Sequence, residues 1–330
     1  MDKLACQKAR SFRVGFLLID GFALMSYSAA VEVLRAANLL GGQTLYDIQH
    51  IPAVGTQAIS SSGAIVVGTV QIGENFDFDL VLVVAGGDPE KFQNQKVFQW
   101  LRSLSYKNIQ LGGVSGGPVI LVAAGLMAGR RMTAHWEHIA ALVEASPSLL
   151  IERSLYVMDR DRITCAGGSS PLDMMHAILM EHHGASFARQ VSDWFLHTEV
   201  RPSGGPQRAG LVERYRTNHP AVVIAIEMME NHMADPLVLG QLAALTDRSS
   251  RQLNRLFHHH LGKSTMAFYR NLRLEMAHKL LTQSTLTVME VALATGFSTA
   301  AHFSKSFRNR YQATPSSLRS PGSGSLNLLR

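Results

Sequence analysis

The sequence predicts two folds in series: an α/β sandwich with a mostly parallel sheet over residues 1–205, and an all-α domain with two helix-turn-helix units over residues 206–330. Three observations lead to this prediction. Short apolar runs alternate with helical patterns in the first part, helical spacing is nearly continuous in the second, and positive charge is concentrated there. The chain is 46% hydrophobic and 17% charged, so it can bury a large core. Because single cores usually stop growing before this length, two domains are expected.

The α/β part opens with a buried strand followed by a helix. Residues 14–19 (VGFLLI) are uniformly apolar and precede Asp20 and Gly21, as expected of a buried parallel strand that ends in a turn. Apolar residues then recur at helical spacing over 29–40, until two glycines interrupt the pattern. The same alternation predicts strands over residues 46–54, 64–67, 80–84 and 109–114 and a helix over 94–105. Strands that alternate with helices predict a mostly parallel sheet with both faces covered.

A last strand over 163–166 leads into a helix that begins at Ser170. Pro171 suits the first position of this helix, and Asp173 completes an approximate capping box with Ser170. Glycines and one serine follow the strand ends, namely Gly21, Gly86, Gly87, Ser115, Gly167 and Gly168. Ligands of such sheets bind beyond the carboxyl ends of the strands, so the sequence predicts a pocket there.

Residues 113–117 (GVSGG) fit the G-x-S-x-G elbow, a strained turn that presents a side chain to the amides of a following helix. Taken alone, the motif suggests a serine hydrolase, in which a base oriented by an acid activates the serine. The candidate bases are His135 and His176, and the candidate acids are Asp159, Asp161 and Asp173. No HGGG-like oxyanion segment is visible, and a short glycine-rich motif arises easily by chance. A ligand-holding elbow is therefore the favoured interpretation.

Segments on both sides of the elbow carry a family resemblance. Residues 85–87 (AGG), 113–117 (GVSGG), 124–131 (AGLMAGRR) and 133–136 (TAHW) resemble the PfpI-type, class I glutamine amidotransferase-like domain, over about residues 12–200. The resemblance implies a flavodoxin-like sandwich. Catalytic relatives carry a cysteine at the elbow, a histidine nearby and a glutamate after the first strand. This chain has Ser115 and His135 but no acid in that loop, so the resemblance implies a pocket that senses a ligand without catalysis.

The candidate ligand-binding residues are placed near the elbow by this resemblance, and they are Phe22, Gly87, Ser115, Gly116, His135 and Trp136. The elbow amides are expected to hold a carboxylate, while Trp136, Phe22 or Tyr27 flanks a cationic group. Core packing of Trp136 and a structural hydrogen bond of His135 are the alternatives.

No catalytic residue, cofactor or metal site is expected. The histidine runs 182–183 and 258–260 place neighbouring side chains about 100° apart on a helix, so neither run presents two ligands on one face. Cys165 could be a redox sensor, but a buried structural cysteine is commoner and is the favoured interpretation.

Charge separates the two parts of the chain. Residues 1–205 hold 16 Lys and Arg against 18 Asp and Glu, whereas residues 206–330 hold 15 against 7, giving net charges of −2 and +8. A basic module suggests a polyanionic partner, most commonly nucleic acid, and a solubilising basic surface is the alternative. Residues 201–206 (RPSGGP) cannot continue a helix or a strand, so the domain boundary is predicted there.

Two stretches of the basic part repeat one pattern, residues 242–257 and 291–307. Equivalent positions of the two stretches are 49 residues apart at Ala243 and Ala292, and 50 residues apart in the second helix of each stretch. Each stretch predicts a short helix, a tight turn, an N-capping serine and a second helix with basic residues outward. This pattern is typical of a helix-turn-helix, whose second helix enters the major groove of DNA. Two tandem copies favour it over a generic helical bundle.

Residues 292–298 (ALATGFS), 302–307 (HFSKSF) and 314–319 (TPSSLR) resemble the AraC-type DNA-binding domain, over about residues 220–320. The DNA-facing candidates are Ser250, Arg251, Gln252, Asn254 and Arg255 in the first unit and Ser298, Thr299, Ala300, His302, Ser304 and Lys305 in the second. Arginine and lysine contact guanine edges or phosphates, whereas glutamine and asparagine suit adenine. Phosphate anchoring is the expected role of the equivalent pair Arg255 and Lys305.

Together these features predict a cytoplasmic, ligand-responsive transcription regulator that is not an enzyme. By resemblance, the effector is a small nitrogen-containing metabolite such as an amino acid, betaine, carnitine or polyamine, and the usual outcome is activation. The expected partners are promoter DNA, RNA polymerase and a second copy of the chain. No membrane partner and no signal peptide are expected, since no apolar run is long enough. The alternatives are a serine hydrolase or amidase that uses Ser115 and His135, and a DNA-binding scaffold without a ligand.

Overall fold

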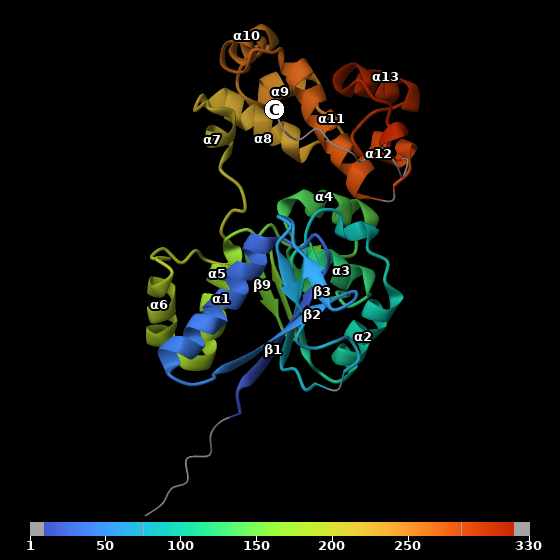
Figure 1. Cartoon of the computed structure of the whole chain (residues 1–330). Coiled ribbons are helices and arrows are strands. Elements are labelled where there is room, and N and C mark those ends of the chain that lie inside the picture. Colours follow the sequence, from blue (N-terminus) through green and yellow to red (C-terminus); the bar gives the residue numbers. More distant parts are fainter. Residues whose placement is uncertain (1–9, 75, 285, 320–330) are drawn as a thin grey trace, which may run out of the picture. The chain divides into compact units, whose positions relative to one another are not determined.

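A computed structural model describes residues 10–74, 76–284 and 286–319 (Figure 1). The chain divides into two compact units, Met1–Ile139 with Ser148–Gln207 and Ala140–Pro147 with Arg208–Arg330. No helix in the described part of the chain is long and apolar enough to cross a membrane.

The first unit contains a six-stranded sheet with the strand order β2-β1-β5-β6-β10-β9. In this order its strands are Tyr46–Pro52, Phe12–Leu18, Leu80–Ala85, Gln110–Ser115, Arg162–Cys165 and Tyr156–Asp159. β9 runs antiparallel to β10, and the other neighbouring pairs are parallel. The predicted α/β sandwich with a mostly parallel sheet is therefore confirmed.

Four short strands lie outside this sheet. β3 (Gln57–Ile59) and β4 (Ile65–Val67) form an antiparallel pair, and β7 (Arg131–Met132) pairs with β8 (Leu150–Ile151). The strand expected at 64–67 thus forms, but it turns back on β3 instead of joining the main sheet. Gly63, with a φ of +85°, lies in the connecting turn and adopts a backbone conformation that glycine favours.

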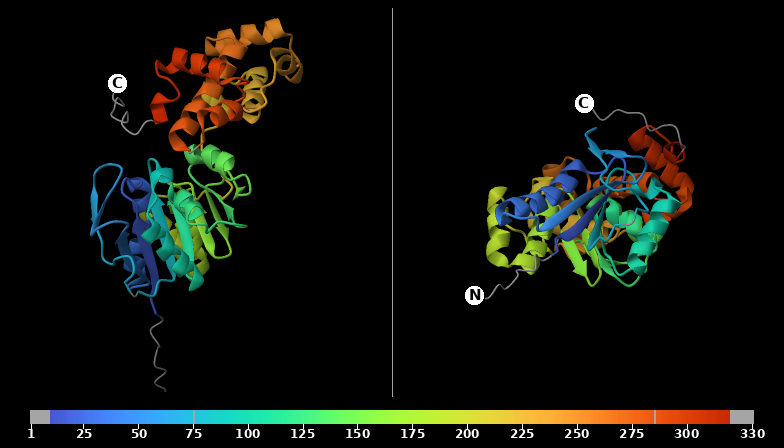
Figure 2. Two further views of the ribbon diagram at one scale, coloured as in Figure 1. Left: turned by 90° about the vertical axis from the view of Figure 1, so that its right-hand side faces the viewer. Right: turned by 60° about the horizontal axis from the view of Figure 1, so that its bottom comes forward.

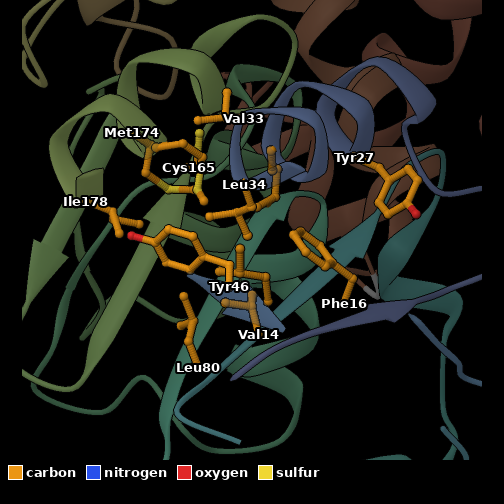
Figure 3. Close-up of a cluster of buried hydrophobic side chains, with 14 of the residues drawn as sticks. Val14, Phe16, Tyr27, Val33, Leu34, Tyr46, Leu80, Cys165, Met174 and Ile178 are labelled. Carbon is orange, nitrogen blue, oxygen red and sulfur yellow. The ribbon is translucent and has the colours of Figure 1, made fainter. Parts of the chain in front are cut away.

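Helices cover both faces of the main sheet (Figures 1 and 2). α1 (Leu24–Gly41), α5 (Ser170–His183) and α6 (Ala185–Trp194) lie on one side, and α2 (Gln95–Tyr106) and α3 (Gly117–Ala123) lie on the other. All six residues of β5 are buried, as expected of a central strand with both faces covered. Figure 3 shows the core beneath α1 and α5, where the packed side chains include Val14, Phe16, Leu34, Leu80, Met174 and Ile178.

The beginning of α5 differs from the prediction. No side chain caps this helix at Ser169 or Ser170, so the expected capping box is wrong. Asp173 is fully buried, and its carboxylate instead accepts hydrogen bonds from His197 Nε2 at 2.9 Å and from Arg201 Nη2 at 2.6 Å. A buried carboxylate needs hydrogen-bond donors, and these contacts hold His197 and Arg201 against α5.

The second unit is helical. Its helices are α7 (Leu211–Tyr215), α8 (Pro220–Asn231), α9 (Leu239–Leu245), α10 (Ser250–Leu261), α11 (Thr265–Gln283), α12 (Val288–Ala294) and α13 (Ala300–Tyr311). The pairs α9–α10 and α12–α13 are the two predicted helix-turn-helix units. Each has its own apolar core, and α11 joins them, because Tyr269 packs in the first core and Leu280 in the second.

Candidate functional site

The elbow at Ser115 is built by strand β6 and by the close approach of α3. Ser115 ends β6 with a φ of +60°, a left-handed conformation that costs a non-glycine residue roughly 1–2 kcal/mol. Side chains at the flanking glycines would collide with backbone: a Cβ on Gly113 would lie 2.5 Å from the nitrogen of Pro118, and one on Gly117 would lie 1.9 Å from the carbonyl oxygen of Val83. The strained turn that the motif predicts is therefore present, and its glycines are required by packing.

The carboxyl ends of four strands lie side by side at this elbow. Leu18 pairs with Val84 in register, and Ala85 pairs with Ser115. Beyond β10, a Cβ on Gly167 would lie 2.6 Å from Cβ of Ser115. The predicted gathering of turn residues at one sheet edge thus exists.

Ser26 was missed by the sequence argument. It is buried on α1, and its hydroxyl oxygen accepts a hydrogen bond from the backbone N–H of Gly168 at 2.8 Å. The same oxygen would lie 2.9 Å from a Cβ on Gly167, so it borders the elbow. The predicted helical pattern began only at residue 29, so Ser26 lay outside it, and helical spacing alone does not show what a residue faces.

The elbow offers fewer free amides than expected. The N–H of Gly116 donates to the carbonyl of Ala85 at 3.0 Å, and the N–H of Val119 donates to Gly116 at 3.0 Å. Pro118 has no N–H at all. The predicted capture of a carboxylate by several elbow amides is therefore corrected, because strand and helix bonds already use most of these donors.

His135 is brought to the elbow by the backbone. Its N–H donates to the carbonyl of Ser115 at 3.2 Å, and its ring lies 5.4 Å from that of Trp136 between centroids. Nδ1 of His135 lies 3.4 Å from the backbone nitrogen of Glu137, whose carboxylate is 3.8 Å away. Both rings are partly exposed, and Gly87 is exposed with a φ of +59°.

Two predicted aromatic contacts are wrong. Phe22 is fully buried and packs edge-to-face on Tyr27. Tyr27 is buried as well, and its hydroxyl is hydrogen bonded to Nδ1 of His50 at 3.0 Å. Both side chains belong to the core because the first strand and α1 pack tightly there, so neither flanks a cationic ligand. Trp136 alone keeps that predicted role.

Two titratable groups that sequence reasoning missed lie near the elbow. Glu90 lies in the short helix η1 (Pro89–Lys91), which packs on the elbow, since a Cβ on Gly116 would be 3.0 Å from Cγ of Pro89. Burial raises the pKa of Glu90 to about 7, and its Oε1 has no hydrogen-bond partner among the described residues. Burial, with a smaller contribution from His135, lowers the pKa of His138 to about 4. In both groups burial acts against the charged form, and at neutral pH His138 is uncharged.

The hydrolase arrangement is not assembled around Ser115. The three candidate acids have other partners: Asp173 binds Arg201, Asp161 binds Arg130, and Asp159 accepts from the backbone of Arg131. His176 is hydrogen bonded to Ser192 at 2.8 Å. None of the three candidate acids, and not His176, therefore completes a triad with Ser115.

Cys165 is fully buried in the core, with its sulfur 3.1 Å from the hydroxyl of Ser170. Burial raises the pKa of its thiol to about 11, so the thiolate needed for redox sensing is scarce at neutral pH.

The recognition helices α10 and α13 share one burial pattern. Leu253 and Phe257 are buried on α10, as Phe303 and Phe307 are on α13. The DNA-facing candidates that are exposed are Arg251, Gln252, Arg255, Ser298, Thr299, His302 and Lys305, and those that are partly buried are Ser250, Asn254, Ala300 and Ser304. Arg255 and Lys305 form no ion pair within the described residues, so both charges face solvent.

Three candidates have scaffold contacts. Thr299, not Ser298, caps α13, since its hydroxyl accepts from the backbone N–H of His302 at 3.2 Å. Gln252 closes a capping box with Ser249 at the start of α10. Asn254 accepts a hydrogen bond from the N–H of Thr265 at 3.0 Å, so its carbonyl oxygen caps α11 and is not available to adenine. Arg308 is also exposed on α13 and was missed.

Comparisons with known proteins match both units. Residues 12–181 match the DJ-1/PfpI family, and residues 242–320 match a helix-turn-helix domain family. The HTH-type transcriptional regulator GlxA of Rhizobium meliloti is 45% identical over 309 residues, which cover 93% of this chain and 95% of that protein. The HTH-type transcriptional regulator CdhR of Pseudomonas aeruginosa is 39% identical over 301 residues, which cover 91% of this chain and 89% of that protein.

Solved structures match somewhat more than half of the chain. An AraC family transcriptional regulator from Pseudomonas putida has 25% identity and a TM-score of 0.51, over 56% of this chain and 99% of that chain. A THiJ/PfpI family protein from Pseudomonas syringae has 20% identity and a TM-score of 0.51, over 58% of this chain and 78% of its own, and this likeness concerns the fold alone.

Proposed function

Because the chain belongs to the HTH-type transcriptional regulators that join a DJ-1/PfpI domain to an AraC-type helix-turn-helix domain, we propose that its first unit binds a small metabolite without converting it and that its second unit binds promoter DNA in response. The observation that carries the first half is the elbow, which keeps its strained backbone but has Ser115 in place of cysteine. Ser115 is a weak nucleophile unless a base activates it.

The DNA-binding half rests on the repeated recognition helices. Arg255 and Lys305 occupy equivalent exposed positions on α10 and α13, in the part of the chain that carries a net charge of +8. We place both side chains against phosphates of two successive major-groove segments. Arg251 and His302, exposed one turn earlier on the same helices, are then the side chains nearest to base edges.

The effector class follows from the family resemblance: an amino acid, betaine, carnitine or polyamine. Ser115, Gly116, Gly87, His135 and Trp136 would line its site. Trp136 suits the cationic nitrogen, because ring faces attract cations, and Ser115 or His135 suits a carboxylate. We further propose a cytoplasmic homodimer that activates transcription through contact with RNA polymerase.

A thermal-shift experiment on the full chain tests the sensor. The probes are glycine betaine, carnitine, arginine and spermidine, because a ligand that binds only the folded state must raise its melting temperature. We expect at least one probe to raise Tm in a concentration-dependent way, and Trp136→Ala to abolish the shift. The exposed Trp194→Ala, on α6, serves as the matched control and should keep it.

The same samples distinguish sensor from enzyme. A stabilising probe that is recovered unchanged after incubation supports the sensor. Its consumption by the wild type but not by Ser115→Ala would establish the hydrolase instead. A failure of all probes to shift Tm would reject this effector class, while the DNA-binding half would still stand on its own test.

A further inference from the structure

A cavity lies in the first unit near the amino ends of β6 and β10, away from the elbow, which lies at the carboxyl end of β6. It has a volume of about 430 Å³ and is lined by the end of α2, the end of α3, the turn before β7 and the first residue of β10. β6 and β10 are parallel, and Arg162 at the start of β10 pairs with Leu111 near the start of β6. The cavity therefore lies roughly 13 Å from Ser115 along β6, given a rise of about 3.3 Å per residue.

Three arginines from three different segments line this cavity: Arg102, Arg130 and Arg162. One carboxylate, that of Asp161, is hydrogen bonded to two of them, at 2.7 Å from Nε of Arg130 and 2.8 Å from Nη1 of Arg162. The hydrogen bond from Arg130 holds the pKa of Asp161 below its usual range, so this group stays ionised. Asp159 also acts on Arg130, but its carboxylate lies 3.5 Å from Arg160, so the arginines leave an excess of positive charge at the cavity.

Each arginine is anchored by the protein. Arg162 is only 4% exposed, and its guanidinium donates to the carbonyl of Leu126 at 3.0 Å and to the hydroxyl of Ser105 at 2.7 Å. Nε of Arg102 donates to the carbonyl of Ala124 at 2.8 Å. These bonds occupy the last carbonyls around the end of α3 and hold the side chains in one arrangement.

The terminal nitrogens of two of these side chains have no acceptor. Among the described residues, no hydrogen bond runs from Nη1 or Nη2 of Arg102 or of Arg130, because each is held through Nε alone. A guanidinium fixed in this way presents a fork of N–H donors that matches the oxygens of a carboxylate or a phosphate.

We propose that this cavity binds a small organic dianion, which Arg102 and Arg130 hold through their terminal nitrogens and Arg162 supports by its buried charge. The volume lies in the range of small-molecule sites. Tyr106, which is 88% exposed at the end of α2 and lines the cavity, supplies a ring for the organic part of the ligand. The two sources of this chemistry are a phosphate ester and a dicarboxylate.

Isothermal titration calorimetry of the full chain at low ionic strength, in chloride buffer and without DNA, tests the proposal. Inorganic phosphate probes the first source and succinate the second. We expect saturable binding of at least one of them, weakened about tenfold or more in Arg102→Gln and in Arg130→Gln, since each change removes charge-assisted hydrogen bonds. Lys107→Gln is the matched control, because this exposed lysine next to α2 carries the same charge but does not line the cavity.

The outcomes separate clearly. Binding of neither anion, wild-type affinity in both arginine variants, or an equal loss in Lys107→Gln would overturn the proposal. Melting curves without anion show whether a variant is folded. If Arg130→Gln is unfolded because Asp161 has lost a partner, Arg102→Lys is the deciding variant. It keeps the positive charge but loses the forked pair of N–H donors, so its affinity for the anion should fall between those of the wild type and Arg102→Gln. The probes differ from those of the elbow, so either site can fail without the other.

Discussion

At the scale of single residues, the backbone of the elbow could be predicted and its surroundings could not. A five-residue motif predicts the strained turn at Ser115 because the reason for it is local, the tight passage from strand to helix. Phe22 and Ser26 show the limit. Whether an aromatic ring lines a pocket or fills the core, and what a helical serine faces, depends on segments distant in sequence.

Gly167 provides a test of this packing. A Cβ there would lie 2.6 Å from Cβ of Ser115 and the backbone has a φ of +89°, so Gly167→Ala combines a clash with backbone strain. We expect it to lower the free energy of unfolding by about 3 kcal/mol. Gly168→Ala is the matched control, because φ is +61° but nothing lies within 4 Å, and about 1 kcal/mol is expected. Urea titrations measure both, and equal losses would contradict the contact.

Glu90 makes a prediction about pH. Its pKa of about 7 in the folded chain is raised by burial above the ordinary value of 4.5, so the folded state keeps a proton that the unfolded state releases. Stability should therefore fall as pH rises from about 4.5 to about 7 and level off above. The difference between the two pKa values corresponds to about 3 kcal/mol, which solvent screening of this half-buried group reduces to about 2 kcal/mol. The neutral isostere in Glu90→Gln should remove this loss.

Melting temperatures at pH 5 and pH 8 check the Glu90 prediction. The difference between the two pH values should be smaller in Glu90→Gln than in the wild type, whereas the exposed Glu199→Gln should behave as the wild type does. An unchanged pH dependence in Glu90→Gln would show that the carboxylate is solvated.

At the scale of elements, both recognition helices were predictable because their apolar spacing and polar faces repeat almost residue for residue. The predictions were wrong for the cap at the start of α13 and for one side chain of α10 that faces a neighbouring helix. Thr299 rather than Ser298 caps α13, since two neighbouring hydroxyls suit the position and only the backbone decides between them. Asn254 faces α11, because a short polar side chain at the edge of the core finds an orphan helix N–H.

The ends of these helices make a second prediction. α10 and α13 both end in a left-handed residue, Gly262 with a φ of +67° and Gln312 with a φ of +54°. Only Gln312 has a side chain in this conformation, so the end of α13 carries a steric strain that the end of α10 does not. Gln312→Gly should stabilise the second unit by about 0.5–1 kcal/mol.

Denaturant titrations followed by helical circular dichroism measure the effect of Gln312→Gly. The reciprocal Gly262→Ala should destabilise by a similar amount, since it places a Cβ in the same conformation at the equivalent position. Stabilisation by both changes, or by neither, would show that the two helix ends are not equivalent.

At the scale of the whole molecule, the uneven distribution of charge predicted two domains with different partners, which no single motif could predict. The segment around the predicted boundary is less free than its prolines and glycines suggest. Arg201 binds Asp173, the carbonyl of Ser203 accepts from Leu155, and Gln207 donates to the carbonyl of Ser154 at 2.7 Å. These bonds join residues far apart in sequence, so local composition could not predict that the first unit retains the segment.

The central claim is that the two helix-turn-helix units bind one DNA duplex through equivalent cations. Fluorescence anisotropy with DNA selected from a random pool tests it most directly, over a series of salt concentrations, for the wild type, Arg255→Ala, Lys305→Ala and the double variant. Each single change should weaken binding about five- to tenfold and lower the salt slope by about one, and the double variant should show both losses. Arg270→Ala, exposed on α11 outside both recognition helices, should bind as the wild type does. Undiminished binding by the double variant would contradict the account.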